Sequence, residues 1–159
     1  MRADEAAARA AMAADAALPG SLSREEHGLL AHAAFNHREA AALLMLRLGF
    51  DPTAPGQDGG SALHAAAWVG NVSMIEALLA RGVAVNALDP THGSPPLGWA
   101  AFGSVHCHNP LGDYAGVIEQ LVRAGADVTM AGNKFGSSMA GMVEGRPEIV
   151  ALLKKLGAT

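Results

Sequence analysis

The chain has 159 residues, a formal net charge of −4 and a single cysteine. This length allows one compact domain or a short repeat array, and a lone cysteine excludes an internal disulfide and a cysteine-rich zinc module. The sequence has no basic block, and no apolar run reaches the roughly 18 to 20 residues that span a membrane. We therefore expect neither a nucleic-acid partner nor a membrane partner.

The first segment, residues 1–22, is rich in alanine and carries charges between Arg2 and Asp15. These charges interrupt the apolar core that a signal peptide needs, so we expect a cytoplasmic protein. We predict a helical N-terminal cap or partial repeat that ends at Pro19 and Gly20, with a frayed tail as the alternative. Ser23 then begins an S-x-x-E pattern, which is typical of a capping box at the start of the next helix.

Four glycines punctuate the rest of the chain at nearly regular intervals. Gly49, Gly82, Gly125 and Gly157 are separated by 33, 43 and 32 residues. Each follows an apolar stretch with the i, i+3, i+4 spacing of a helix that buries one face. A shorter alanine-rich stretch precedes each apolar stretch in the first three units, as in "ALHAAAWVG". The pattern predicts an all-α array whose unit is helix, turn, helix, glycine and extended connector.

Residues 59–89, "GGSALHAAAWVGNVSMIEALLARGVAVNALD", resemble an ankyrin repeat. They follow the family's G-x-T-P-L-H-x-A-A pattern and its L-L-x-x-G-A ending, with Ser61 and Ala62 as departures. The next unit has Gly98 where the family has histidine, and the preceding unit has His37 in place of the inter-helix glycine. A similar lengthened third unit occurs in bacterial ankyrin proteins that the segment "PLGWA…GS…GDY" resembles.

The resemblance implies an ankyrin-repeat solenoid of about four helix-turn-helix units with hairpin-like connectors and terminal caps. We predict an ankyrin repeat domain over residues 23–158. Its units are expected at about 23–56, 57–89, 90–131 and 132–158, the last forming the C-terminal cap. The resemblance also gives His64 a structural role, in which the ring hydrogen-bonds backbone between neighbouring repeats. A catalytic His64 would need a nucleophile or carboxylate nearby, and "ALHAAAW" offers none.

In this family the ends of the first helices and the hairpin tips form a concave surface that binds partners. Phe35, Trp68 and Phe102 recur along that face at one repeat spacing, either as exposed anchors or as rings that pack on each other. Trp99 is expected to be partly buried. The predicted hairpin tips lie near 57–60, 90–94 and 132–135. The candidate partner-binding residues are Phe35, Asn36, Gln57, Asp58, Trp68, Val69, Thr91, His92, Phe102, Asn133 and Lys134.

The third unit is longer because of the segment "FGSVHCHNPLGDY", residues 102–114. We place nine extra residues between its two helices, within 104–113, projecting away from the hairpin tips, and one extra residue in the preceding hairpin. His106, Cys107, His108 and Asp113 offer metal donors. Three of them are consecutive, however, whereas structural zinc takes spaced pairs, so we predict no metal or other cofactor. Asp113 is better placed as the N-cap of the helix that follows.

The sequence lacks the phosphate-binding, metalloprotease and nucleophile-elbow motifs, so we predict no enzyme. The predicted function is a non-catalytic, monomeric binding module that recognises another protein. The alternative is a small-molecule binding protein or enzyme with a pocket around His64, Trp68, Trp99 and Phe102. An open groove would favour the first function, and an enclosed cavity the second.

Overall fold

A computed structural model describes residues 18–130 and 132–158. The described residues contain helices and no strand, which confirms the all-α prediction. No described helix is both long and apolar enough to cross a bilayer. The elements are α2 (Leu18–Ser21), α3 (Arg24–His27), α4 (Leu29–Phe35), α5 (Glu39–Arg47), α6 (Ala62–Val69), α7 (Val72–Leu79), α8 (Pro96–His106), α9 (Tyr114–Arg123), the 3₁₀ turn η1 (Gly141–Val143) and α10 (Pro147–Lys155).

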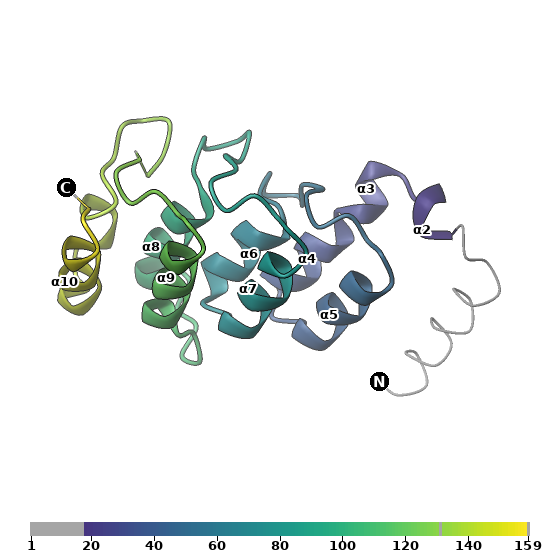
Figure 1. The fold of residues 1–159 in the computed structure, drawn as a ribbon, viewed down its shortest axis with the longest axis horizontal. Coiled ribbons are helices and arrows are strands. Elements are labelled where there is room, and N and C mark those ends of the chain that lie inside the picture. Colours follow the sequence, from purple (N-terminus) through teal and green to yellow (C-terminus); the bar gives the residue numbers. More distant parts are fainter. Residues whose placement is uncertain (1–17, 131, 159) are drawn as a thin grey trace.

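The helices form antiparallel pairs that stack side by side into an elongated array (Figure 1). In the middle of the array, α6 packs between α4 and α8, and α7 contacts α5 and α9. The long connectors lie along one edge, which we call the connector edge, and the helix–helix turns lie along the opposite turn edge. The last unit has only η1 where the others have a first helix, which agrees with its degenerate sequence.

Small side chains allow the first helices to lie close together. Ala65, Ala66 and Ala67 on α6 are all buried, and Leu63 of the same helix is fully covered. The second helices contribute the larger side chains at helical spacing, such as Ile118 and Leu121. Each large aliphatic side chain buried in this way stabilises the fold by about 1.5–3 kcal/mol. The core is therefore a continuous stripe along the array, as stacked repeats require.

The punctuating glycines end the second helices in the left-handed conformation. Their φ angles are 91° at Gly49, 74° at Gly82, 97° at Gly125 and 104° at Gly157. Residues with a β-carbon adopt this conformation only at a cost, which explains why glycine recurs there.

The helix–helix turns of the first two units share one geometry. Gly70 has φ 72° and His37, at the matching position, has φ 58°. Asn71 N donates to Ala66 O, and in the first unit Arg38 N donates to Ala33 O, five residues back in both cases. His37 therefore takes the backbone conformation of the glycine that it replaces.

The third unit corrects the prediction that all nine extra residues lie between its helices. Helix α8 has 11 residues against 8 in α6, and α9 has 10 against 8 in α7. The left-handed residue that ends the first helix is His108, which lies 13 residues after the N-cap Pro95, whereas Gly70 lies nine after Ser61. The insertion thus lengthens both helices as well as the loop, because Val105 and His106 continue the helix.

The remaining loop of the insertion lies on the turn edge, away from the connectors, as predicted (Figure 1). It folds back on the second unit: Asn109 Nδ2 donates to Val69 O, and Asp113 N donates to Gly70 O at 2.9 Å. Asp113 also caps α9, its carboxylate accepting from Gly116 N at 2.8 Å, which confirms the predicted N-cap.

The predicted N-terminal cap, residues 1–22, lies largely outside the described residues, which include only α2 from its helical part. The capping box that follows is confirmed. Ser23 N donates to Glu26 Oε2, and Glu26 N donates to the Ser23 hydroxyl. The helices lie within the predicted units, whose boundaries remain predictions.

Candidate functional site

Three tight hairpins at the connector edge fall where the sequence predicts them. Gly56 N donates to Gly60 O, Asp89 N to Ser94 O and Gly132 N to Ser137 O. The second closure spans one residue more than the first, which confirms the predicted extra residue in that hairpin. The second and third hairpins are also bonded to each other, because Lys134 N donates to His92 O at 2.8 Å.

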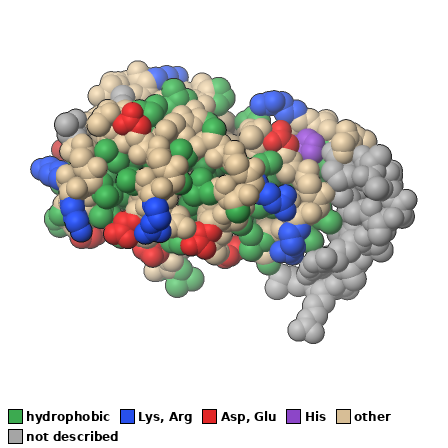
Figure 2. Space-filling model, in the orientation of Figure 1, with side chains coloured by type: hydrophobic (Ala, Val, Ile, Leu, Met, Phe, Trp, Pro, Cys, Tyr) green, Lys and Arg blue, Asp and Glu red, His purple; other side chains and the backbone are tan. Residues whose placement is uncertain are grey.

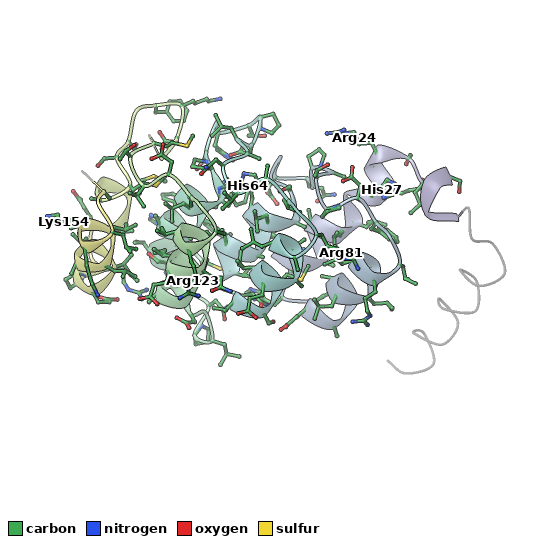
Figure 3. All side chains as sticks on the ribbon, in the orientation of Figure 1. Arg24, His27, His64, Arg81, Arg123 and Lys154 are labelled. Carbon is green, nitrogen blue, oxygen red and sulfur yellow. The ribbon has the colours of Figure 1, made fainter. Side chains whose placement is uncertain are left out.

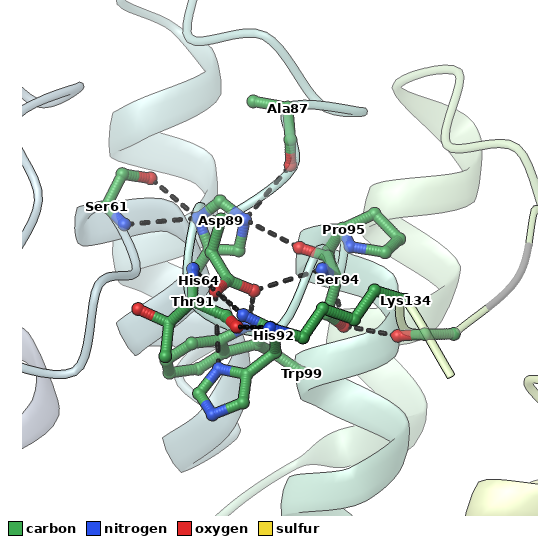
Figure 4. A network of polar contacts seen from close by, with 11 residues as sticks. Ser61, His64, Ala87, Asp89, Thr91, His92, Ser94, Pro95, Trp99 and Lys134 are labelled. Carbon is green, nitrogen blue, oxygen red and sulfur yellow. Dashed lines mark hydrogen bonds and ion pairs between the residues drawn. The ribbon is translucent and has the colours of Figure 1, made fainter. Parts of the chain in front are cut away.

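His64 joins the second and third repeats beneath these hairpins (Figure 4). Its Nδ1 accepts from Ser61 N at 3.2 Å, so Nε2 carries the proton and donates to Ala87 O at 3.0 Å and Ser94 O at 3.2 Å. The ring is 2% exposed, and burial lowers the pKa of His64, which keeps it neutral. The predicted structural role is confirmed, and both ring nitrogens are occupied by it.

Asp89 forms the second centre of this network. Its carboxylate accepts from the backbone N–H groups of Thr91, His92 and Ser94 and from Trp99 Nε1 at 2.9 Å. Burial raises the pKa of Asp89, but these hydrogen bonds outweigh burial and hold the pKa below its usual value. The carboxylate is therefore charged, and it fixes both the hairpin backbone and the indole of Trp99.

In the third unit, Gly98 occupies the position that His64 has in the second unit. A β-carbon at Gly98 would lie 2.4 Å from Ser94 Oγ and 2.5 Å from Gly132 O. The Ser94 hydroxyl instead donates to Gly132 O and so links the second hairpin to the third. A serine in the hairpin replaces the histidine in the helix as the bond between repeats.

The aromatic row predicted along the first helices forms a contiguous cluster. The rings of Phe35 and Trp68 are stacked with centroids 6.0 Å apart, and Trp68 and Phe102 are 5.9 Å apart. Trp99 contacts Trp68 edge-on at 6.3 Å. Phe35 and Trp68 are half-buried and Phe102 is 43% exposed. The rings therefore pack on one another, as one interpretation of the row predicts, and remain partly accessible to solvent.

This row lines a groove of about 510 Å³ that is open to solvent. The first helices contribute the aromatic row, and the hairpins contribute polar groups and one further ring, Phe135. The lining residues are Phe35, Asp58, Trp68, His92, Ser94, Gly98, Trp99, Phe102, Asn133, Phe135 and Met142.

Comparison with known families decides the fold family. A family model for ankyrin repeats, three copies, matches residues 29–131, which is more than half of the chain. The chain belongs to the ankyrin repeat family. Repeats of this family generally mediate protein–protein interaction and are generally not enzymes.

One curated relative of this ankyrin array is Protein PhlB of Serratia liquefaciens. The two are 35% identical over 106 residues, which cover 65% of this chain and 41% of the relative. The chain thus matches less than half of the relative's length.

Six of the predicted contact residues line the ankyrin groove, namely Phe35, Asp58, Trp68, His92, Phe102 and Asn133. Asn36, Gln57, Thr91 and Lys134 are exposed beside it. Val69 requires a correction. Val69 is 2% exposed at the end of α6, where the inserted loop folds back and Asn109 bonds to its carbonyl oxygen, so it presents no side chain to a partner.

Sequence reasoning missed four lining residues, Ser94, Gly98, Phe135 and Met142, and underestimated the burial of Trp99. Phe135, next to the predicted contact Lys134, is 77% exposed at the tip of the third hairpin. Met142 reaches the groove from η1, where the sequence gives no helical pattern to orient it. Trp99 is 7% exposed rather than partly buried, because Asp89 holds its indole inward. An aromatic residue at a predicted hairpin tip was the signal available for Phe135.

The donors of the insertion do not assemble into a metal site. Among the described residues no group of three or more His, Cys, Asp or Glu side chains could hold a metal ion. The His106 ring lies 4.1 Å from the Phe102 ring, His108 Nδ1 lies 2.7 Å from His106 O, and Asp113 caps α9. These side chains serve local structure in the ankyrin array.

Proposed function

We propose that this chain is a non-catalytic binding module that recognises a segment of another protein in the aromatic groove. The observation that supports the proposal most strongly is the open groove formed by the row Phe35, Trp68 and Phe102 together with Phe135. Rigid aromatic side chains that are already packed lose little conformational entropy on binding, and such residues dominate protein interfaces.

The opposite face of the array is less suited to this role. Figure 2 shows the side that carries α5, α7 and α9, where acidic and basic side chains are interspersed among hydrophobic ones. Such a mixed surface is typical of solvated helices and offers no concentrated apolar anchor. The partner is therefore expected on the side of α4, α6 and α8.

The groove's volume also suits a small organic molecule, since ligand pockets typically measure about 300–1,000 Å³. Its openness favours a polypeptide, because a small-molecule site usually encloses most of its ligand. Catalysis would require a reactive group at the groove. Of the two histidines near the hairpins, His64 is buried and bonded at both nitrogens, and His92 lies with Nδ1 3.2 Å from the Asp89 carboxylate, so both take part in the hairpin network.

The proposal is tested by affinity capture from the native host with the wild-type chain and the Trp68→Ala variant. We expect proteins captured by the wild type to be lost from the variant, because Trp68 lies at the centre of the row. Leu111→Ala is the matched control, since Leu111 is 91% exposed on the loop at the opposite edge. Circular dichroism checks that both variants keep the wild-type helix content.

Capture profiles that are identical for the wild type and Trp68→Ala would contradict the proposed groove. Any partner retained by Leu111→Ala but lost from Trp68→Ala is then purified and titrated into the wild-type chain. We expect complex formation to perturb the fluorescence of the two tryptophans, which both line the groove. The monomeric state and cytoplasmic location predicted from the sequence remain predictions, to be checked by light scattering and cell fractionation.

A further inference from the structure

The formal charge on the described lining of the aromatic groove is negative, and the nearest cation of the hairpins, Lys134, lies at its rim. Asp58 is the only Asp, Glu, Lys or Arg side chain among the lining residues described. A second carboxylate, Asp89, lies beneath Trp99 and His92 and is held charged by its hydrogen bonds. Of the labelled basic residues, Arg24 and Lys154 lie toward the two ends of the array, and Arg81 and Arg123 lie at the second helices α7 and α9 (Figure 3).

The ring faces add to this negative character. An aromatic ring carries a negative face, and a cation within about 6 Å of its centroid is attracted to it, most strongly by tryptophan. Trp68 is half-buried between Phe35 and Phe102 and contributes to the groove lining. A basic guest side chain would therefore be attracted by the ring faces and by the two carboxylates. An acidic guest side chain would be repelled by the two carboxylates.

The rim of the groove already contains one such arrangement. Lys134 Nζ lies 5.4 Å from the centroid of the Phe135 ring and donates to Thr91 O at 2.6 Å. This lysine belongs to the third hairpin and is the positive charge next to two lining residues, Asn133 and Phe135. Its positive charge repels a second cation nearby, so removing this charge should strengthen the binding of a basic side chain.

We propose that the groove accepts an arginine or lysine side chain of a partner polypeptide, flanked by apolar residues that pack on the aromatic row. This inference rests on the proposed function, because it assumes that the groove binds a protein segment. It adds the chemistry of that segment. The carboxylates and ring faces select the basic residue, and the volume of about 510 Å³ leaves room for its apolar neighbours.

Three blocked peptides test the proposal on the full chain: acetyl-Ala-Leu-Arg-Leu-Ala-amide and its counterparts with Met or Glu at the centre. Trp68 and Trp99 are the two tryptophans of the chain, so the indole N–H signals in a nitrogen-15 spectrum report directly on the groove. We expect the Arg peptide to shift these signals and to bind at least about threefold more tightly than the Met peptide. The Glu peptide should bind most weakly.

Three variants separate charge from apolar contact. Asp58→Asn should weaken the Arg peptide by about twofold to threefold, and Lys134→Gln should strengthen it by a similar factor, with the Met peptide unchanged in both. Trp68→Leu keeps an apolar side chain but removes the ring face. It should bring the Arg and Met peptides to nearly equal affinity, read from the Trp99 signal.

The inference is overturned if the Met peptide binds as tightly as the Arg peptide, or if the Arg peptide shifts neither indole signal. It is also overturned if Asp58→Asn and Lys134→Gln both leave the affinity of the Arg peptide unchanged. Failure of the proposed function has a different signature, namely a native partner that is captured equally by Trp68→Ala. A native partner that needs Trp68 but inserts an acidic or wholly apolar segment would refute only the present inference.

Discussion

The connector edge and the turn edge of the array come from the same repeating motif, but they differ in what their sequences tolerate. At the connector edge, His64 and the Ser94 hydroxyl bond neighbouring units to each other, and Asp89 fixes the backbone of the second hairpin (Figure 4). At the turn edge, His37 replaces a glycine and the third unit accepts nine extra residues. The difference arises because the connectors contact each other across repeats, whereas the first two helix–helix turns are closed by bonds within their own units and the inserted loop has room to fold back over the second unit.

The comparison predicts that the largest loss of stability comes from Asp89. Asp89→Ala removes an acceptor shared by three backbone N–H groups and the Trp99 indole, and leaves the donors of Ser94 and Trp99 buried without it. We expect the free energy of unfolding to fall by about 3 kcal/mol, measured by urea denaturation. Asp113→Ala is the control at the turn edge, where an exposed N-cap is worth about 1 kcal/mol. Equal losses would contradict the distinction between the two edges.

His64 should make the connector edge sensitive to pH. Burial lowers the pKa of His64 from its usual 6.5, so the unfolded chain takes up a proton before the folded one does. The free energy of unfolding should therefore decrease as the pH falls below about 6.5, until the lowered folded pKa is reached. Denaturation at several pH values between 7 and about 5 measures this slope.

The non-titrating variant His64→Asn isolates that effect from the other histidines. It should cost about 2 kcal/mol at pH 7, because Asn does not reproduce the contacts to both Ala87 O and Ser94 O. Its stability should then change less between pH 6.5 and about 5 than that of the wild type. A slope as steep as that of the wild type would show that His64 is not the group responsible.

Alanine substitutions at two glycines distinguish an isolated turn, at Gly82, from a turn that the insertion covers, at Gly70. Gly82→Ala pays only for the left-handed conformation, about 1 kcal/mol, because nothing lies within 4 Å of the added β-carbon. Gly70→Ala has the same conformational cost and also displaces the inserted loop, since the β-carbon would lie 2.7 Å from Gly112 Cα. We expect Gly70→Ala to cost about 2 kcal/mol or more by thermal unfolding. Equal costs would show that the loop does not rest on the second unit.

Much of this fold was predictable because it repeats. The glycine spacing and the apolar stripes predict the helix pairs, and the family pattern assigns His64 its hydrogen bonds. The insertion was assigned to the correct unit and edge, but its first residues continue helix α8 instead of forming a loop. Whether residues such as Val105 extend a helix or form a loop depends on tertiary contacts that periodicity does not contain.

The groove was predictable only in part, for a related reason. Repeat spacing places Phe35, Trp68 and Phe102 on one side of the array. The depth of Trp99 depends on the carboxylate of Asp89, ten residues away, and the orientation of Val69 depends on the phase of a helix that is apolar on nearly all sides. Alanine-rich helices give a weak apolar–polar contrast, so periodicity does not define their exposed face.

The smallest expected effect is a gain in stability at His37. This exposed residue has φ 58°, in the region where a β-carbon costs about 1 kcal/mol. His37→Gly should raise the free energy of unfolding by about 0.5–1 kcal/mol, less any entropy gained by the unfolded chain. His108→Gly is the matched test, with φ 54° but with its Nδ1 2.7 Å from His106 O. Its gain should be smaller, because glycine loses that contact, and a larger gain at His108 would mean that the contact contributes nothing to the turn.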